Sequence, residues 1–230
     1  MKSILVFLLA VVFLGGGTHI GVSPVTTVVN LEDGTQQTDY EALSKKIYAE
    51  LVAFRSTADM PANVKAAAER VKQLLINGGF PTGDIQVVSP NPELGSVVAR
   101  FRGQAPGGGP PSKEPVMLMA HLDVVDALRS DWEFEPFELR EMDGYFYGRG
   151  TDDNKAGIAH IVTNFIRLRD EGYVPDRDLV AVFTADEETS SDSIKYLVRE
   201  RRDLVDSVFA INSDAGGGEL FNGAPNIFNV

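Results

Sequence analysis

Apolar residues recur with helical spacing in two stretches near the start of the chain. The first stretch should begin at the capping-box pattern of residues 38–41, and intervals of three and four residues give it one apolar face. That face is made by Tyr40, Leu43, Ile47, Leu51 and Phe54. A second helix is expected from Pro61 to the Gly78-Gly79 pair, which is typical of a helix end.

Further along the chain, short apolar runs typical of strands alternate with helical patterns. Strands are expected at residues 84–89, 95–101, 116–120, 179–184 and 207–211. Helices are expected at residues 154–169 and 190–202, and the Gly- and Pro-rich residues 103–115 should form a surface loop. This alternation predicts an α/β layered domain with a largely parallel central sheet flanked by helices.

The N-terminal residues have the pattern of a secretory signal peptide. Lys2 precedes an apolar run at residues 4–14, and small residues follow that run. A permanent membrane span needs about 20 apolar residues, so no stable span is expected. We therefore interpret residues 1–23 as a signal peptide and residues 24–37 as a polar leader, and we expect a secreted or periplasmic protein.

Composition narrows the chemistry. The 230 residues carry a formal net charge of −12, whereas nucleic acids and anionic membranes select basic surfaces. Nucleic acid is therefore not an expected partner. The sequence has no cysteine, which excludes disulfides, thiolate nucleophiles and cysteine-held metals. Any metal must be held by His, Asp or Glu side chains.

Three of the expected strands end in imidazole or acidic side chains. Residues 116–120 lead into His121-Leu122-Asp123, residues 179–184 lead into Asp186-Glu187-Glu188, and residues 207–211 lead to Asp214. In α/β sheets, ligands bind outside the carboxyl ends of the strands. The sequence therefore predicts a site at this edge of the sheet.

The individual motifs allow ordinary structural interpretations as well. Asp123 lies two residues from His121, so it could orient a ligating imidazole, form a surface ion pair or cap a strand end. The glycine-rich turn at residues 148–155 brings Asp153 to a helix start, where backbone N–H groups favour a carboxylate. A helix N-cap is the alternative there, and it is the interpretation for Asp152.

The adjacent acidic pair Glu187-Glu188 also has two interpretations. Such pairs are commonly solvated acidic turns. Here the pair directly follows an apolar strand, and neighbouring side chains point in different directions. One carboxylate could therefore bind metal while the other handles protons.

Together, these motifs resemble in order and spacing the signature of zinc metallopeptidase family 20. The family includes acetylornithine deacetylase, succinyl-diaminopimelate desuccinylase, aminoacylases, dipeptidases and carboxypeptidase G. Residues 132–137 and 143–148 also look like the family, and the resemblance covers roughly residues 40–214. It implies that residues 38–230 are the N-terminal part of a zinc-exopeptidase-like catalytic domain.

The resemblance also implies a role for each matching residue. Asp123 would orient His121, Asp153 would bridge two metals, and Glu187 would be the general base. The implied metal ligands are His121, Asp153, Glu188 and Asp214. The implied cofactor is Zn²⁺, two ions per site, with Co²⁺ or Mn²⁺ as substitutes, and such a pair activates water against a scissile carbonyl.

The chain departs from the family pattern in two respects. The family's second metal takes a further histidine from far downstream, but the other histidines here are His19, in the signal region, and His160, on an apolar helix. The family also inserts a lid or dimerisation domain after the Asp214 region. We therefore expect a fragment truncated before that domain, inactive and weak in metal binding by itself, with a homodimer possible only through the missing lid.

Two functions follow as hypotheses. The first is an exported metal-dependent hydrolase that cleaves amide or peptide bonds of small peptides or N-acyl amino acids. The second is a non-catalytic metal- or peptide-binding protein that retains a half-site. The presence of Glu187 favours the enzyme, because a binding protein has no need of a general base.

Overall fold

The computed structural model describes residues 39–214, 217–221 and 224–229. The interpretation of residues 1–23 as a signal peptide, that of residues 24–37 as a leader and the capping role of Thr38 lie outside the described residues. The statements below concern the described residues alone.

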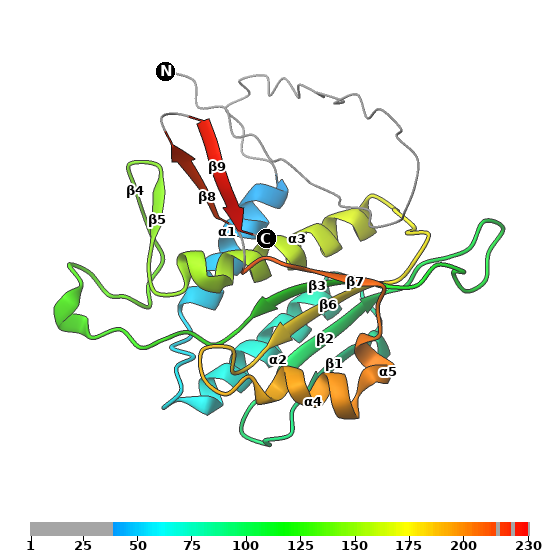
Figure 1. The fold of residues 1–230 in the computed structure, drawn as a ribbon, viewed down its shortest axis with the longest axis horizontal. Coiled ribbons are helices and arrows are strands. Elements are labelled where there is room, and N and C mark those ends of the chain that lie inside the picture. The colour runs from blue at the N-terminus through cyan, green and yellow to red at the C-terminus, as the bar shows by residue number, and fades with distance from the viewer. Residues whose placement is uncertain (1–38, 215–216, 222–223, 230) are drawn as a thin grey trace. The chain divides into compact units, whose positions relative to one another are not determined.

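A five-stranded sheet with the order β1-β2-β6-β3-β7 lies at the centre of the fold (Figure 1). Its strands, in that order, are Ile85–Val88, Ser96–Phe101, Leu179–Thr184, Val116–His121 and Phe209–Asn212. Strand β3 pairs in parallel with β6 on one side and with β7 on the other. The expected α/β layered architecture is confirmed.

The sheet is mixed, although the sequence predicted a largely parallel one. Strand β2 runs antiparallel to both β1 and β6, so parallel pairing is confined to β6, β3 and β7. Strands β1 and β2 are joined by a short loop, and a short loop returns the chain antiparallel, whereas a parallel pair needs a longer crossover. Helix α3 provides such a crossover between β3 and β6.

Helices cover both faces of the sheet. The helices α1 (Asp39–Val52), α2 (Pro61–Asn77) and α3 (Ala156–Asp170) pack on one face, while α4 (Asp192–Glu200) and α5 (Arg202–Val205) lie on the other (Figure 1). Alternate residues of the strands face the two layers: Val97, Ala99, Ala181 and Phe183 face the first, and Val98, Val180 and Val182 face the second. Because helices cover both faces, both sets of alternating side chains are buried, and the strands are therefore apolar throughout. No helix in the described ranges is long and apolar enough to cross a membrane.

Three phenylalanine rings join the end of the sheet to the first helical layer. Phe165 on α3 lies 5.9 Å from the ring of Phe80 and 5.8 Å from the ring of Phe101 on β2. The rings of Phe80 and Phe101 meet edge to face at 5.2 Å. All three side chains are buried, so they anchor α3, the helix that directly follows the turn carrying part of the site described below.

Two small hairpins were not predicted. Strands β4 (Arg140–Met142) and β5 (Tyr145–Tyr147) are joined at Asp143-Gly144, where both residues have positive φ. Asp-Gly is a strong hairpin signal, so the sequence did contain this information. Strands β8 (Gly217–Phe221) and β9 (Ala224–Asn229) form the second hairpin. Single helical turns occur at Thr82–Asp84 and Arg129–Asp131.

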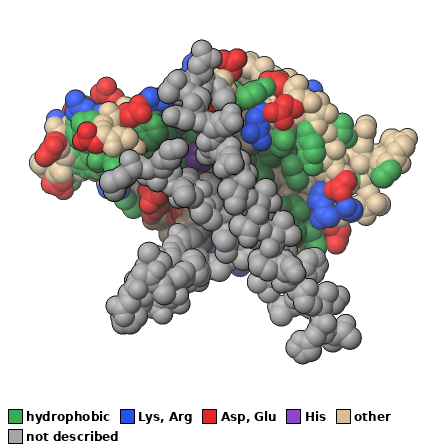
Figure 2. Space-filling view, turned by 90° about the horizontal axis from the view of Figure 1, so that it is seen from above, with side chains coloured by type: hydrophobic (Ala, Val, Ile, Leu, Met, Phe, Trp, Pro, Cys, Tyr) green, Lys and Arg blue, Asp and Glu red, His purple; other side chains and the backbone are tan. Residues whose placement is uncertain are grey.

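On the face drawn in Figure 2, Lys and Arg side chains lie interspersed with Asp and Glu side chains. Among the described residues visible there, the basic side chains form no continuous area.

Replacing the central ring of the aromatic cluster should destabilise the protein. Phe165→Ala removes two ring contacts and leaves a cavity, so the free energy of unfolding should fall by about 3–5 kcal/mol in chemical denaturation. The matched control is Tyr145→Ala, since Tyr145 is 68% exposed and its loss should change stability by less than about 1 kcal/mol. Equal effects of the two changes would show that the cluster does not anchor α3.

Candidate metal centre

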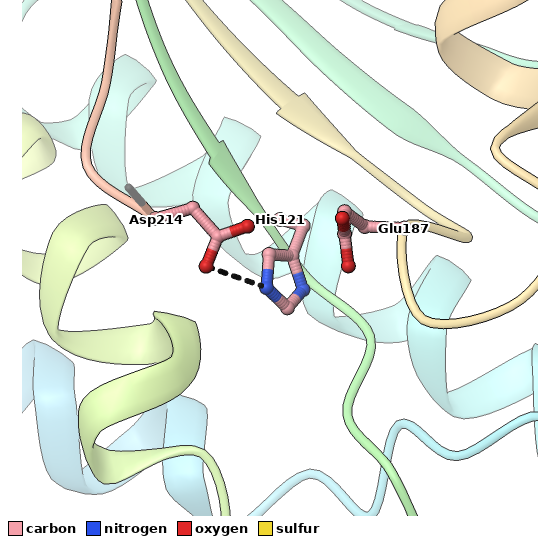
Figure 3. Close-up of side chains that lie close together, drawn as sticks. All are labelled: His121, Glu187 and Asp214. Carbon is pink, nitrogen blue, oxygen red and sulfur yellow. Dashed lines mark ion pairs between the residues drawn. The ribbon is translucent and has the colours of Figure 1, made fainter. Parts of the chain in front are cut away.

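The side chains that the sequence singled out converge at the carboxyl ends of the parallel strands. His121 is the last residue of β3, Glu187 and Glu188 follow β6, and Asp214 follows β7. Register explains this convergence, because His121 on β3 lies beside Thr184, the last residue of β6. In Figure 3 the imidazole of His121 lies between the carboxylates of Glu187 and Asp214.

Two groups of side chains have the composition and spacing of metal-binding sites. The potential ligand atoms of His121, Glu187 and Asp214 lie within 4.8 Å of one another, and so do those of His121, Asp153 and Glu188. The Nε2 atom of His121 lies 2.6 Å from Asp153 and 3.6 Å from Asp214. His121 thus belongs to both groups, and four carboxylates surround its imidazole.

Asp123 holds the other side of the imidazole. The Nδ1 atom of His121 lies 2.9 Å from the backbone carbonyl oxygen of Asp123 and 3.4 Å from its carboxylate. The hydrogen bond that orients the ring is therefore made by the main chain, and the carboxylate adds a charge next to it. This geometry leaves Nε2 directed at Asp153 and Asp214.

The carboxylate of Asp123 also fixes the Glu187-Glu188 pair. One of its oxygens accepts the backbone N–H of Glu187 and the other accepts that of Glu188, each at 3.0 Å. Asp186, which precedes the pair, is buried, and its carboxylate accepts the hydroxyl of Ser190 and the backbone N–H of Ser193 near the start of α4. Both buried carboxylates are satisfied, so the acidic pair is held from two sides.

The turn that carries Asp153 is packed tightly against its surroundings. Residues Thr151–Lys155 form a single wide turn in which the peptide bond between Asp153 and Asn154 is cis. Gly150 begins the turn at φ 81°, and a Cβ there would lie 2.7 Å from Val124, so the position requires glycine. Helix α3 accordingly begins at Ala156 rather than at the predicted Asn154, and it begins without a side-chain cap.

The start of α3 touches the end of β7 at Gly157. The hydroxyl of Ser213 donates a 3.0 Å hydrogen bond to the side-chain oxygen of buried Asn154. A Cβ at Gly157 would lie 2.2 Å from both of these oxygens. This close contact sets the distance between the segments that carry Asp153 and Asp214.

Comparison with known proteins gives these residues a family context. Residues 117–226 match the model of peptidase family M20/M25/M40. Over this segment, which is somewhat under half of the chain, the sequence is similar to the peptidases of this family. The matched segment contains the three strand ends and the glycine-rich turn described above.

Curated relatives are similar over the same part of the chain. Over 85 residues the chain is 41% identical to the N-fatty-acyl-amino acid synthase/hydrolase PM20D1 of Mus musculus. This match covers 37% of this chain and 17% of that protein. Over 113 residues it is 34% identical to the probable succinyl-diaminopimelate desuccinylase of Staphylococcus aureus. This match covers 49% of this chain and 26% of that protein. The matched segments thus span about a quarter or less of these relatives.

Solved structures share the fold over a larger part of the chain. Human carnosine dipeptidase 1 superposes with a TM-score of 0.63 at 20% identity, over 78% of this chain and 43% of that one. The di-peptidase Dug1p of Saccharomyces cerevisiae gives a TM-score of 0.62 at 23% identity, over 76% of this chain and 39% of that one. Both comparisons place the central sheet and its helices in the fold of the M20 peptidases.

Among the residues of the candidate metal centre, His121 has a strongly shifted pKa. Burial lowers the pKa of its imidazole, but the hydrogen bonds and charges of Asp123, Asp153 and Asp214 outweigh burial and raise the pKa to about 9. In the metal-free protein at neutral pH the ring is therefore protonated and donates from both nitrogens. Burial and the neighbouring charge of Asp153 raise the pKa of Glu188.

The candidate metal centre is open to solvent on one side. The side chain of His121 is 1% exposed, whereas those of Asp214 and Asp153 are 21% and 58% exposed. A cavity of about 170 Å³ adjoins His121, Glu187 and Asp214. A larger cavity, about 1120 Å³, is lined by residues that include Phe101 and Arg169, and none of the predicted site residues is among those that line it.

The structure thus brings together His121, Asp153, Glu187, Glu188 and Asp214, with Asp123 behind the imidazole. It does not add a second histidine. His160 is exposed on α3 and belongs to neither candidate metal group of the described residues, and His19 lies outside them. The assignment of individual roles, such as the bridging ligand or the base, stays a prediction.

Sequence reasoning missed the residues that support this site from behind. Lys155, the last residue of the glycine-rich motif, is fully buried, and so is Ser56 in the loop after α1. Asp186 was noted as part of a motif but received no role. A lysine directly after an acidic turn is usually solvent-exposed, so no signal in the sequence indicated its burial.

Removing one carboxylate should lower the pKa of His121. Asp153→Asn deletes a charge 2.6 Å from Nε2, so the pKa of the imidazole in the metal-free protein should fall by about 1. NMR titration of the imidazole protons measures the change. The control Asp152→Asn alters the neighbouring exposed residue and should leave the titration unchanged. An unaltered pKa in Asp153→Asn would show that Asp153 does not pair with His121.

Proposed function

We propose that this chain carries part of the active site of a metal-dependent hydrolase that cleaves amide bonds of small peptides or N-acyl amino acids. The observation that carries the proposal is the convergence of one oriented imidazole and four carboxylates. These side chains form two groups, each close enough together to hold a metal ion. The similarity of residues 117–226 to the M20 peptidases supports it, because the relatives named above are hydrolases by name.

The donor set fits divalent metal ions. His121 offers Nε2 while its Nδ1 is held by Asp123, which is the usual arrangement for a ligating imidazole. Asp153, Glu188 and Asp214 would supply carboxylate oxygens around it. Mixed imidazole and carboxylate ligands favour zinc, with cobalt or manganese as substitutes. We propose two ions per site, with Asp153 as the ligand that they share.

Bound ions of this kind lower the pKa of water and polarise a scissile carbonyl. Within that chemistry we assign proton transfer to Glu187. Its backbone N–H is held by Asp123, and its side chain lies on the opposite side of His121 from Asp214 (Figure 3). In this position Glu187 accepts the proton of the attacking water and passes it to the departing amine. Glu188, anchored by the same carboxylate, serves as a metal ligand.

The substrate class rests on the relatives. PM20D1 is named for N-fatty-acyl amino acids, the Staphylococcus aureus relative for succinyl-diaminopimelate, and carnosine dipeptidase for a dipeptide. All three names describe an amide bond beside an amino acid. We propose the same bond for this protein, and from the signal-like pattern of residues 1–23 we also propose that the reaction takes place outside the cytoplasm.

Replacing the proposed base should separate metal binding from turnover. In the full-length protein, Glu187→Gln keeps the shape of the side chain but cannot accept a proton, so kcat on N-acyl amino acids or dipeptides should fall about 10²–10⁴-fold while the metal content stays that of the wild type. Steady-state assays and elemental analysis measure the two quantities. Glu138→Gln, an exposed change outside the site, is the control.

The outcomes of that comparison are distinct. Near-normal turnover in Glu187→Gln would rule out its role as base. Wild-type protein that holds metal but turns over no member of a panel of peptides and N-acyl amino acids would favour the non-catalytic binding function.

The proposed bridging ligand has its own test. Asp153→Ala removes the carboxylate that both ions are proposed to share, so zinc content measured by elemental analysis should fall from two ions toward none per chain. Asp152→Ala is the adjacent control and should keep both ions. Retention of two ions in Asp153→Ala would exclude a bridging role.

A further inference from the structure

Lys155 is a buried cation for which the proposed chemistry has no use. Its side chain is 0% exposed, although lysine is among the residues least often buried. The ammonium donates to the backbone oxygens of Leu51 and Phe54 at 2.9 and 3.1 Å and to the hydroxyl of Ser56 at 2.6 Å. All three of its N–H groups are thus satisfied by uncharged acceptors, and no ion pair within the described residues includes it.

These acceptors belong to the segment that leaves α1. Leu51 lies in the last turn of that helix and Phe54 in the segment after it. Their carbonyl oxygens also accept the backbone N–H groups of Phe54 and Ser56, so the ammonium adds a second donor to each and ties the end of α1 to residue 155. Tyr48 on the same helix donates a 2.6 Å hydrogen bond to the backbone oxygen of Thr151, so α1 holds the Asp153 turn at both of its ends.

Ser56 extends the connection to the strand that carries His121. Its hydroxyl donates to the backbone oxygen of Leu122 at 2.7 Å, and its backbone oxygen accepts the N–H of Val124 at 3.0 Å. The residues between these two bonds include Asp123, which orients His121. A continuous series of hydrogen bonds thus runs from Lys155 through Ser56 to the segment beside the imidazole.

Burying an ammonium is costly, and the hydrogen bonds to uncharged acceptors offset that cost only in part. A methionine would fill the same space without that cost. The ammonium must therefore contribute something that apolar packing does not, and its three directional bonds are the contribution visible in the structure.

We propose that Lys155 is a positioning residue that fixes the Asp153-bearing turn relative to the His121-bearing strand end and so sets the spacing of the metal ligands. This inference rests on the proposed metal-dependent function. Lys155 has no role on substrate in this proposal, because its side chain is 0% exposed and its three N–H groups are engaged by Leu51, Phe54 and Ser56. Its influence passes through the main chain of residues 151–155 and 122–124.

The test compares Lys155→Met with a remote destabilising change. Lys155→Met keeps the length and volume of the side chain but loses three hydrogen bonds. The control is Leu75→Ala, which opens a cavity in α2, at a residue that is 0% exposed and absent from both ligand groups. Both variants of the full chain are loaded with Co²⁺, whose visible absorption reports ligand number and geometry, and the dissociation constant is measured by titration.

Lys155→Met should weaken Co²⁺ binding by about tenfold or more and change the absorption spectrum, while Leu75→Ala keeps the wild-type spectrum and affinity despite its lower melting temperature. Affinity of Lys155→Met within about twofold of wild type would overturn the proposal. An equal loss of affinity in both variants would also overturn it, since general destabilisation would then explain the effect.

Hydrogen exchange of the metal-free proteins provides a readout that does not depend on metal. Peptides covering residues 148–157 should exchange about tenfold faster in Lys155→Met than in wild type, whereas peptides of α2 stay unchanged. If wild-type protein binds no Co²⁺, the proposed function fails, and exchange still decides the positioning role. Unchanged exchange at residues 148–157 would refute it.

Ser56→Ala keeps the test decisive if Lys155→Met does not fold. This change removes one of the three acceptors and the link to Leu122, and it leaves the ammonium two carbonyl partners. A smaller shift in the same direction, in both Co²⁺ affinity and exchange at residues 148–157, is expected. Wild-type values in a folded Ser56→Ala variant would contradict the proposed connection.

Discussion

The in-register parallel pairing of β3 with β6 and β7 is the constraint on which the candidate site depends. It aligns the ends of three strands, so that the residues after them meet at one edge of the sheet. A shift of one residue between β3 and β6 would turn the side chain of His121 to the opposite face. The apolar residues that alternate between the two helical layers prevent such a shift, because it would expose one layer's contacts. The strand register that packs the core is therefore also the register that brings the site residues together.

Two buried carboxylates fix the backbone of the loop that carries the Glu187-Glu188 pair. Asp123 and Asp186 are both buried, and each accepts several hydrogen bonds from the loop that follows β6. Carboxylates satisfied in this way fix main-chain atoms more firmly than apolar contacts do, because hydrogen bonds are directional. The flexible glutamate side chains thus start from fixed backbone positions. In our proposal Lys155 has the corresponding role for the turn that carries Asp153, as a donor to carbonyl groups instead of an acceptor of N–H groups.

Periodicity predicted the elements that bury an apolar face. The bounds of β6 agree with the expected residues 179–184, and α2 ends before Gly78 as expected. The candidate ligands were also predicted, because each follows an apolar strand or a glycine-rich turn. The direction of β2 was not predictable from its apolar pattern, since alternation is the same in parallel and antiparallel strands. The burial of Lys155 was equally hidden, because it depends on carbonyls at the end of α1, a hundred residues earlier in the chain.

The unequal exposure of the ligand atoms has a consequence for metal uptake. The carboxylates of Asp153 and Asp214 face solvent to different extents, while the imidazole of His121 lies behind them and is held rigidly by Asp123. A cation taken up at the proposed site would meet the outer carboxylate oxygens first, and the inner nitrogen could bind it only once the imidazole had lost its proton. Uptake would therefore release a proton from His121 to solution.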